Sequence, residues 1–206
     1  MNPTTDRLPQ QPPALQTIRE LKENTFIFIK DKALPLDVCK EMIRRFEASE
    51  DQQYQGRIGQ TIETDRSIKK STDLVVSGKQ HWKDIDQELF RSLGMAIREF
   101  REAYPFFRGP FKDSGYAIQR TNPGEYYHWH IDGGSHEFSQ RQLVAVWYLN
   151  DVPGPGGATE FSYQDVQVQP QAGSLLLFPP FWTHEHRGAI LEQGVKYIAT
   201  TWVVFA

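Results

Sequence analysis

Cysteine is almost absent from this sequence, which has one, Cys39, among 206 residues. A single thiol cannot form an internal disulfide, and it excludes a structural zinc site built from several cysteines. Long apolar runs are also missing, since no stretch approaches the roughly 18 to 20 residues that span a bilayer. Residues 1–16 contain neither a basic segment nor an apolar one, which argues against a secretory signal. We therefore expect a soluble, cytoplasmic protein with no membrane partner.

A strong charge of one sign is lacking too. The 23 Lys and Arg residues nearly balance 26 Asp and Glu residues, which leaves a net charge of -3. Such a chain has no general attraction to nucleic-acid phosphates, so we expect no nucleic-acid partner. Residues 1–14 contain four prolines among polar residues and are expected to form a disordered tail. The remaining residues, 15–206, suit one domain.

The first half of the sequence predicts two amphipathic helices. After Pro35, apolar residues recur at helical spacing from Val38 to Phe46. A second apolar stripe runs from Ile85 to Tyr104, where Asp84 with Gln87 resembles a capping box and the following proline ends the helix. The intervening residues 49–80 are polar and irregular, with one expected strand at 72–76, and they carry no recognisable motif.

From Gly115 onward the pattern changes to short apolar runs separated by Gly and Pro, which is typical of strands. These runs are YAIQRT, YYHWHID, QLVAVWYLN, ATEFSY, VQVQP, SLLLFPP and YIATTWVVF, and FIFIKD at 26–31 is an earlier one. Two helices followed by seven or eight strands predict a mostly β, α+β fold with a jelly-roll core and flanking helices.

Two imidazoles and one carboxylate form a candidate metal site. His130 and Asp132 lie two residues apart, so a strand would direct both to one face, and His186 could complete the set. This combination is the facial triad of non-haem Fe(II) oxygenases, which leaves metal positions open. Periodicity also places His128 on the face of His130, and His184 on the face of His186, so it does not choose among them.

Three segments together resemble the catalytic core of the prolyl 4-hydroxylase-like branch of the 2-oxoglutarate and Fe(II)-dependent oxygenases. They are TNPGEYYHWHID, RQLVAVWYLNDVPGPGGATEF and QPQAGSLLLFPPFWTHEHRGAILEQGVKYIATTW. Within them the HxD motif, GGxTxF at 156–161 and HxGx5GxK at 186–196 stand in the family's order and spacing. The similarity covers residues 115–206, and it implies a double-stranded β-helix supported by N-terminal helices.

The resemblance also chooses among the histidines. The HxD motif requires His130, and the family's third ligand stands ten residues before a basic residue, which from Lys196 gives His186. The implied Fe(II) ligands are therefore His130, Asp132 and His186. Halogenating relatives lack the carboxylate, so Asp132 implies hydroxylation.

The co-substrate implied by the resemblance is 2-oxoglutarate. Its 5-carboxylate is expected to pair with Lys196, with Tyr148 and Thr200 as hydroxyl donors. Thr121 stands where the family often has a tyrosine, which puts any co-substrate contact from that strand in doubt.

The implied reaction consumes O2 and 2-oxoglutarate, releases succinate and CO2, and hydroxylates a C–H bond, with ascorbate as a reductant. A peptide or protein substrate hydroxylated on proline is expected first, and a small molecule is the alternative. The competing class is a cupin-like protein that binds a metal and a small ligand, and the HWH motif at 128–130 suggests it. The glutamate expected three or four residues after HxH is absent there, since Glu137 comes later.

Overall fold

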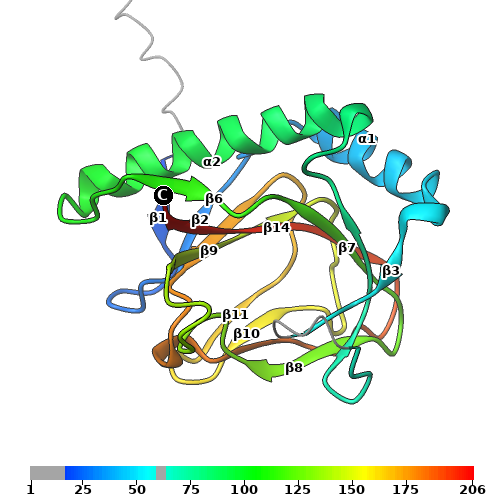
Figure 1. Cartoon of the computed structure of the whole chain (residues 1–206). Coiled ribbons are helices and arrows are strands. Elements are labelled where there is room, and N and C mark those ends of the chain that lie inside the picture. The colour runs from blue at the N-terminus through cyan, green and yellow to red at the C-terminus, as the bar shows by residue number, and fades with distance from the viewer. Residues whose placement is uncertain (1–16, 59–63) are drawn as a thin grey trace, which may run out of the picture.

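Two amphipathic helices cover one face of a β-sandwich (Figure 1). The structure is a computed structural model that describes residues 17–58 and 64–206, so the tail predicted at 1–14 lies outside the described residues. Helix α1 spans Leu36–Glu47 and buries Cys39, Met42 and Phe46. Helix α2 spans Lys83–Ala103. Both predicted helices are confirmed, and the burial of Cys39 fits its expected place on the apolar face.

The start of α2 differs from the prediction. Its N-cap is Trp82, which makes no capping hydrogen bond with its side chain, and Asp84 lies inside the first turn. The guanidinium of Arg45 on α1 donates to both carboxylate oxygens of Asp84, at 2.8 and 2.7 Å. The predicted capping box is therefore wrong, because this carboxylate pairs with another helix. The end of α2 is as expected, since Tyr104 precedes a proline and leaves the helical conformation with ψ 76°.

The larger sheet is antiparallel and has the order β1-β2-β12-β9-β14-β7-β5-β3, with β6 also paired to β14. Its strands are β1 Arg19–Glu20, β2 Phe28–Lys30, β3 Tyr54–Gln55, β5 Thr72–Val75, β6 Phe111–Asp113, β7 Ala117–Thr121, β9 Arg141–Tyr148, β12 Leu175–Phe178 and β14 Lys196–Phe205.

The smaller sheet faces it and has the order β11-β10-β13-β8-β4. Its strands are β4 Lys69–Lys70, β8 Tyr126–His130, β10 Thr159–Phe161, β11 Val166–Val168 and β13 His186–Gly188. Three short 3-10 helices, η1 Glu50–Gln52, η2 Gln80–Trp82 and η3 Trp182–His184, lie in the connections. The expected helix-flanked jelly roll is confirmed, including every strand that we predicted. In the described residues, no helix is both long enough and apolar enough to cross a membrane.

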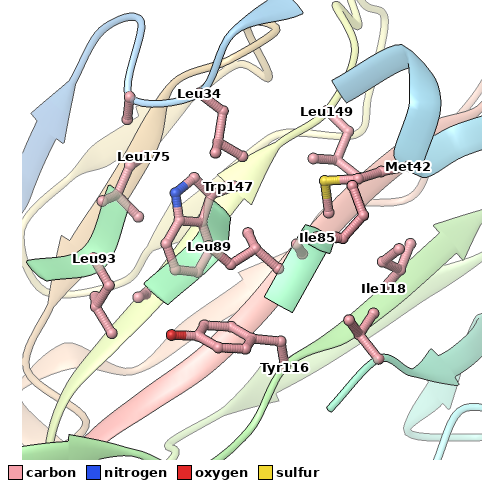
Figure 2. Packing of buried hydrophobic residues seen from close by; sticks show 14 of the residues in the cluster. Leu34, Met42, Ile85, Leu89, Leu93, Tyr116, Ile118, Trp147, Leu149 and Leu175 are labelled. Atoms are coloured by element: carbon pink, nitrogen blue, oxygen red, sulfur yellow. The ribbon is translucent and has the colours of Figure 1, made fainter. Parts of the chain in front are cut away.

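The larger sheet has one core on each side. On the helix side, Leu89 and Leu93 of α2 pack around Trp147 of β9 and beside Tyr116 (Figure 2). The fully buried Trp147 indole donates a 2.9 Å hydrogen bond to the Ser92 hydroxyl. On the other side, apolar residues of β9, β10, β11 and β12 fill part of the space between the sheets. The rest of that space is a cavity that contains the candidate site.

Candidate metal centre

Strand pairing brings two histidines from distant parts of the chain together. His130 ends β8 and His186 begins β13, and the two residues are register partners whose ring centroids lie 4.2 Å apart. Asp132 follows β8 in a turn where the amide groups of Asp132 and Gly133 both donate to the Pro180 carbonyl, at 3.1 and 2.7 Å. This turn returns the Asp132 carboxylate toward both imidazoles.

The three side chains are close enough to share one metal ion. One ligand atom from each of His130, Asp132 and His186 lies within 4.8 Å of the others. The Asp132 Oδ2 atom is 3.1 Å from His186 Nε2 and 4.0 Å from His130 Nε2. Neither His128 nor Glu137 belongs to this cluster. The donor set is therefore two imidazoles and one carboxylate, without the cupin-like histidine pair.

Backbone hydrogen bonds fix which ring nitrogen faces this space. His130 Nδ1 lies 2.7 Å from the His128 carbonyl, and His186 Nδ1 lies 2.9 Å from the His184 carbonyl. Because a carbonyl oxygen only accepts, each Nδ1 carries a proton, and Nε2 is the ring nitrogen that faces the cluster and would bind a metal in its deprotonated form. Such secondary contacts are the usual means by which proteins orient metal-binding histidines.

The protonation states also suit a metal site. Burial, with the adjacent His186, lowers the pKa of His130 to about 4. Burial opposes the charge of Asp132, but the hydrogen bond and charge of His186 outweigh it and hold the pKa of this carboxyl well below its usual range. Neutral imidazole and ionised carboxylate are the forms that bind metals. With nitrogen and oxygen donors and no thiolate, the residues fit Fe(II).

The second oxygen of Asp132 is held from the opposite side. Trp202 Nε1 donates to Asp132 Oδ1 at 3.1 Å, and Arg141 donates to the Asp132 backbone carbonyl at 2.6 Å. The guanidinium of Arg141 lies between two rings, 3.7 Å from the Trp202 centroid and 3.8 Å from that of Phe138. The carboxylate therefore has one oxygen bound to the protein and the other directed at the histidines.

A β-bulge in β8 gives His128 a different position from the one predicted. The register pairs His130 with His186 and Tyr127 with Gly188, so β8 has one more residue than β13 between these points. Tyr127 thereby shares the inner face with His130, and their rings stack 3.5 Å apart. His128 is exposed and does not line the cavity. The prediction that His128 shares the face of His130 is wrong, because regular alternation does not hold across the bulge.

His184 is a structural residue next to the site. Its side chain is buried, with Nε2 2.9 Å from the Thr25 carbonyl and Nδ1 2.9 Å from the Thr183 hydroxyl. Its own carbonyl accepts the proton of His186 Nδ1. Both ring nitrogens are therefore engaged away from the cluster, and His184 supports His186 through the backbone.

Lys196 lines the same cavity of about 140 Å³ as the three candidate ligands. It is buried, and its ammonium donates to the Gly157 carbonyl at 2.7 Å. Burial lowers the pKa of Lys196 to about 8, and no carboxylate of the described residues forms an ion pair with it. A buried cation without an anion is costly, so this position favours an anionic ligand.

The other two predicted co-substrate residues differ in position. Thr200 lines the cavity. Tyr148 is fully buried behind it, and its hydroxyl donates to the hydroxyl of Thr159, which does line the cavity. Thr121, at the position where the family often has tyrosine, lines it as well. Both predicted roles, for Tyr148 and Thr200, stay predictions.

Sequence reasoning missed part of the cavity wall. Arg57, Lys69 and Lys70 line it from the segment that we expected to carry no motif. Lys69 and Lys70 form β4, which pairs with Tyr127 and Tyr126 of β8. The available signal was two adjacent lysines directly before a strand, a pattern that is more often a solvated edge.

Comparison with known families supports the same reading of the fold. Residues 116–204 match the family described as the 2OG-Fe(II) oxygenase superfamily. No curated protein sequence matches the chain.

Three solved structures resemble it. A prolyl hydroxylase from Trichoplax adhaerens, in complex with a hypoxia inducible factor peptide fragment, is 16% identical with a TM-score of 0.74, covering 88% of this chain and 84% of its own. A Pseudomonas putida prolyl-4-hydroxylase is 18% identical with a TM-score of 0.66, covering 88% and 93%. The viral collagen prolyl hydroxylase of Paramecium Bursaria Chlorella virus-1 is 17% identical with a TM-score of 0.64, covering 91% and 99%.

These structural likenesses confirm the double-stranded β-helix fold. The family match, with the His-Asp-His cluster inside the matched residues, implies Fe(II) as the metal and 2-oxoglutarate and O2 as the co-substrates. Residues 116–204 thus match the 2OG-Fe(II) oxygenase superfamily, and the chain is a 2-oxoglutarate-dependent oxygenase with a prolyl hydroxylase-like fold.

Proposed function

We propose that this oxygenase hydroxylates a proline of a peptide or protein, with conversion of 2-oxoglutarate to succinate and CO2. The observation that carries the proposal is the cavity itself, which is lined by both the His130, Asp132 and His186 cluster and the buried Lys196. A metal site and a separate buried cation are what a chelating dicarboxylate requires at its two ends.

In this proposal His130 and His186 hold Fe(II) through Nε2, and Asp132 holds it through Oδ2. When bound, Fe(II) with 2-oxoglutarate and O2 supplies the oxidising chemistry, and ascorbate keeps the metal reduced. The protein positions the reactants and keeps water away. Tyr127 stacks on His130, and Trp202 with Arg141 fixes Asp132. The His184 carbonyl holds the ring of His186, so all three ligands are positioned in the absence of a metal.

Lys196 binds the 5-carboxylate of 2-oxoglutarate in this account, since an ammonium buried among apolar groups needs an anionic partner. Thr200 donates a hydroxyl from the same strand. Tyr148 acts indirectly, because its hydroxyl donates a hydrogen bond to Thr159 and so orients the Thr159 hydroxyl on the cavity wall.

The peptide substrate is supported by the similarity in fold to three prolyl hydroxylases, one of which was solved with a peptide fragment. We further propose that residues 15–206 act as a single domain and that the enzyme works in the cytoplasm, where 2-oxoglutarate and Fe(II) are available.

Succinate formation tests the reaction. Purified protein is incubated with Fe(II), ascorbate, O2 and 2-oxoglutarate, alone and with proline-containing peptides, and succinate and peptide mass are measured. We expect succinate in every wild-type sample, with more of it and a gain of one oxygen atom for an accepted peptide. Asp132→Ala should yield neither product. Wild-type protein that produces no succinate at all would contradict the proposal.

A further inference from the structure

The cavity wall carries more positive charge than the proposed reactants neutralise. Among the residues that the structure describes, four cationic side chains and one carboxylate line it: Arg57, Lys69, Lys70, Lys196 and Asp132. Divalent iron, Lys196 and Asp132 together carry a charge of about +2, which dianionic 2-oxoglutarate balances. The other three cations come from β4 and from the segment that follows β3, and they are not needed for the metal or the co-substrate.

One of these three cations is neutralised inside the protein. Lys69 and Asp73 are both buried and form a 2.7 Å ion pair, and the Ser71 hydroxyl donates to the other oxygen of Asp73 at 2.7 Å. The Lys69 ammonium also lies 5.2 Å from the centroid of Tyr127. The charge of Lys69 is therefore balanced by Asp73, so we do not assign Lys69 to a ligand.

Arg57 and Lys70 are in a different situation. Within residues 17–58 and 64–206, neither forms an ion pair with a carboxylate. Each is instead placed over an aromatic ring, Arg57 4.4 Å from the centroid of Tyr54 and Lys70 5.1 Å from that of Tyr126. Contact with a ring orients a cation without neutralising it. Among the described residues, two oriented charges without a carboxylate partner therefore line the cavity next to the metal cluster.

We infer that Arg57 and Lys70 bind an anionic side chain of the substrate, a few residues from the hydroxylated position. This inference rests on the proposed peptide substrate and specifies its class: a peptide with an acidic residue beside the target. The recognised group is an oxyanion, which either the carboxylate of Asp and Glu or the phosphoryl group of phosphoserine supplies. Arginine suits both groups through its paired donors, and lysine adds a point charge.

Peptide binding tests the inference directly. Seven-residue peptides with a central proline carry Glu, phosphoserine, Ala or Lys at one other position at a time. Affinity is measured by calorimetry on the full chain with Fe(II) and 2-oxoglutarate under anaerobic conditions, where no turnover occurs. At one or more positions we expect Glu or phosphoserine to bind better than Ala, and Lys to bind worse. The ratio between Glu and phosphoserine peptides then distinguishes the two sources of the oxyanion.

Variants connect that preference to the two residues. Arg57→Gln and Lys70→Gln should each weaken acidic-peptide binding by about three- to tenfold, while Ala peptides bind as before. The exposed Arg108 and Lys112 provide matched controls, since Arg108→Gln and Lys112→Gln remove the same charges elsewhere on the surface. The double reversal Arg57→Glu with Lys70→Glu should favour Lys peptides, a gain that misfolding would not produce.

The result separates this inference from the proposed reaction. Succinate formation with equal binding of Glu, Ala and Lys peptides overturns the inference alone, and so does an acidic preference that survives in the double Gln variant. Charge-selective binding without succinate supports the inference and contradicts the reaction. Failure of every peptide to bind overturns the inference even where succinate forms.

Discussion

The indole of Trp202 on β14 donates a hydrogen bond to Asp132 Oδ1 at 3.1 Å, across 70 positions of sequence. The same ring lies 3.7 Å from the guanidinium of Arg141, which donates to the Asp132 backbone. His186 contacts the other oxygen, Oδ2, at 3.1 Å, so the two contacts together fix the orientation of the Asp132 carboxylate. Trp202 is thus a positioning residue for the metal site.

Trp202→Phe should weaken metal binding. Phenylalanine keeps a ring against Arg141 but has no N–H to hold Asp132 Oδ1, and lost contacts of this kind cost metal sites about 10- to 100-fold in affinity. Titration of the variant with Mn(II), followed by calorimetry, measures the loss. Far-ultraviolet circular dichroism should remain that of the wild type. An unchanged dissociation constant would show that Asp132 needs no such support.

Binding of 2-oxoglutarate should depend on pH through Lys196. Burial lowers the pKa of Lys196 to about 8, and only the ammonium form pairs with a carboxylate. A bound carboxylate raises this pKa again, so protonation and binding favour one another. Affinity should therefore be highest below pH 8 and should fall as the pH rises above it.

Lys196→Arg provides the control for that profile, because a guanidinium stays charged over the whole range. Equilibrium dialysis with labelled 2-oxoglutarate between pH 6.5 and 9.5 should show a decline for the wild type and a flatter curve for the variant. Identical curves would mean that another group, or the metal itself, controls the pH dependence.

The buried Lys69 and Asp73 pair should be sensitive to the loss of either partner. Asp73→Ala leaves a buried ammonium without its anion, a change that costs about 3 to 5 kcal/mol. The double variant Lys69→Met with Asp73→Leu removes both charges and should recover much of that loss. Urea unfolding of the three proteins measures it. A double variant less stable than Asp73→Ala would contradict this account.

Core packing against α2 should affect stability without affecting the site. Leu89 is fully buried beside Trp147 on the helix side of the larger sheet (Figure 2). The metal cluster lies on the other side of that sheet, in the cavity that Val144 and Val146 also line. Leu89→Ala should lower the free energy of unfolding by about 2 to 5 kcal/mol. Mn(II) affinity measured at a temperature where the variant is folded should not change. Leu93→Ala, one turn later on the same face, should behave alike.

Local pattern predicted most of the fold because the chain's apolar periods match its elements. The stripe from Ile85 to Tyr104 specified α2, and the runs separated by Gly and Pro specified the longer strands of the sandwich. The short strands β1, β3, β4 and β6 were not predicted. Local pattern could not predict contacts between residues that are far apart in the sequence. The choice of Asp84 as a cap failed because Arg45, on another helix, pairs with that carboxylate.

In the candidate site, too, local pattern predicted some features, and those that depend on long-range pairing were missed. The spacing of His130 and Asp132 predicted a shared metal, and the structure places His186 beside them. Strict alternation then failed at His128, because a bulge in β8 depends on the partner strand and leaves no mark in the local sequence. Arg57 and Lys70 were missed for a related reason, since strand pairing brings them to the cavity: β4 with Lys70 pairs with β8, and β3, just before Arg57, pairs with β5.

The central claim is that His130, Asp132 and His186 hold one Fe(II) with positions open to a chelating keto acid. Anaerobic addition of Fe(II) and then 2-oxoglutarate to the purified protein, followed by visible absorption, tests it most directly. We predict a charge-transfer band that requires both additions and is lost in Asp132→Ala. A featureless spectrum from the folded wild-type protein would contradict the claim.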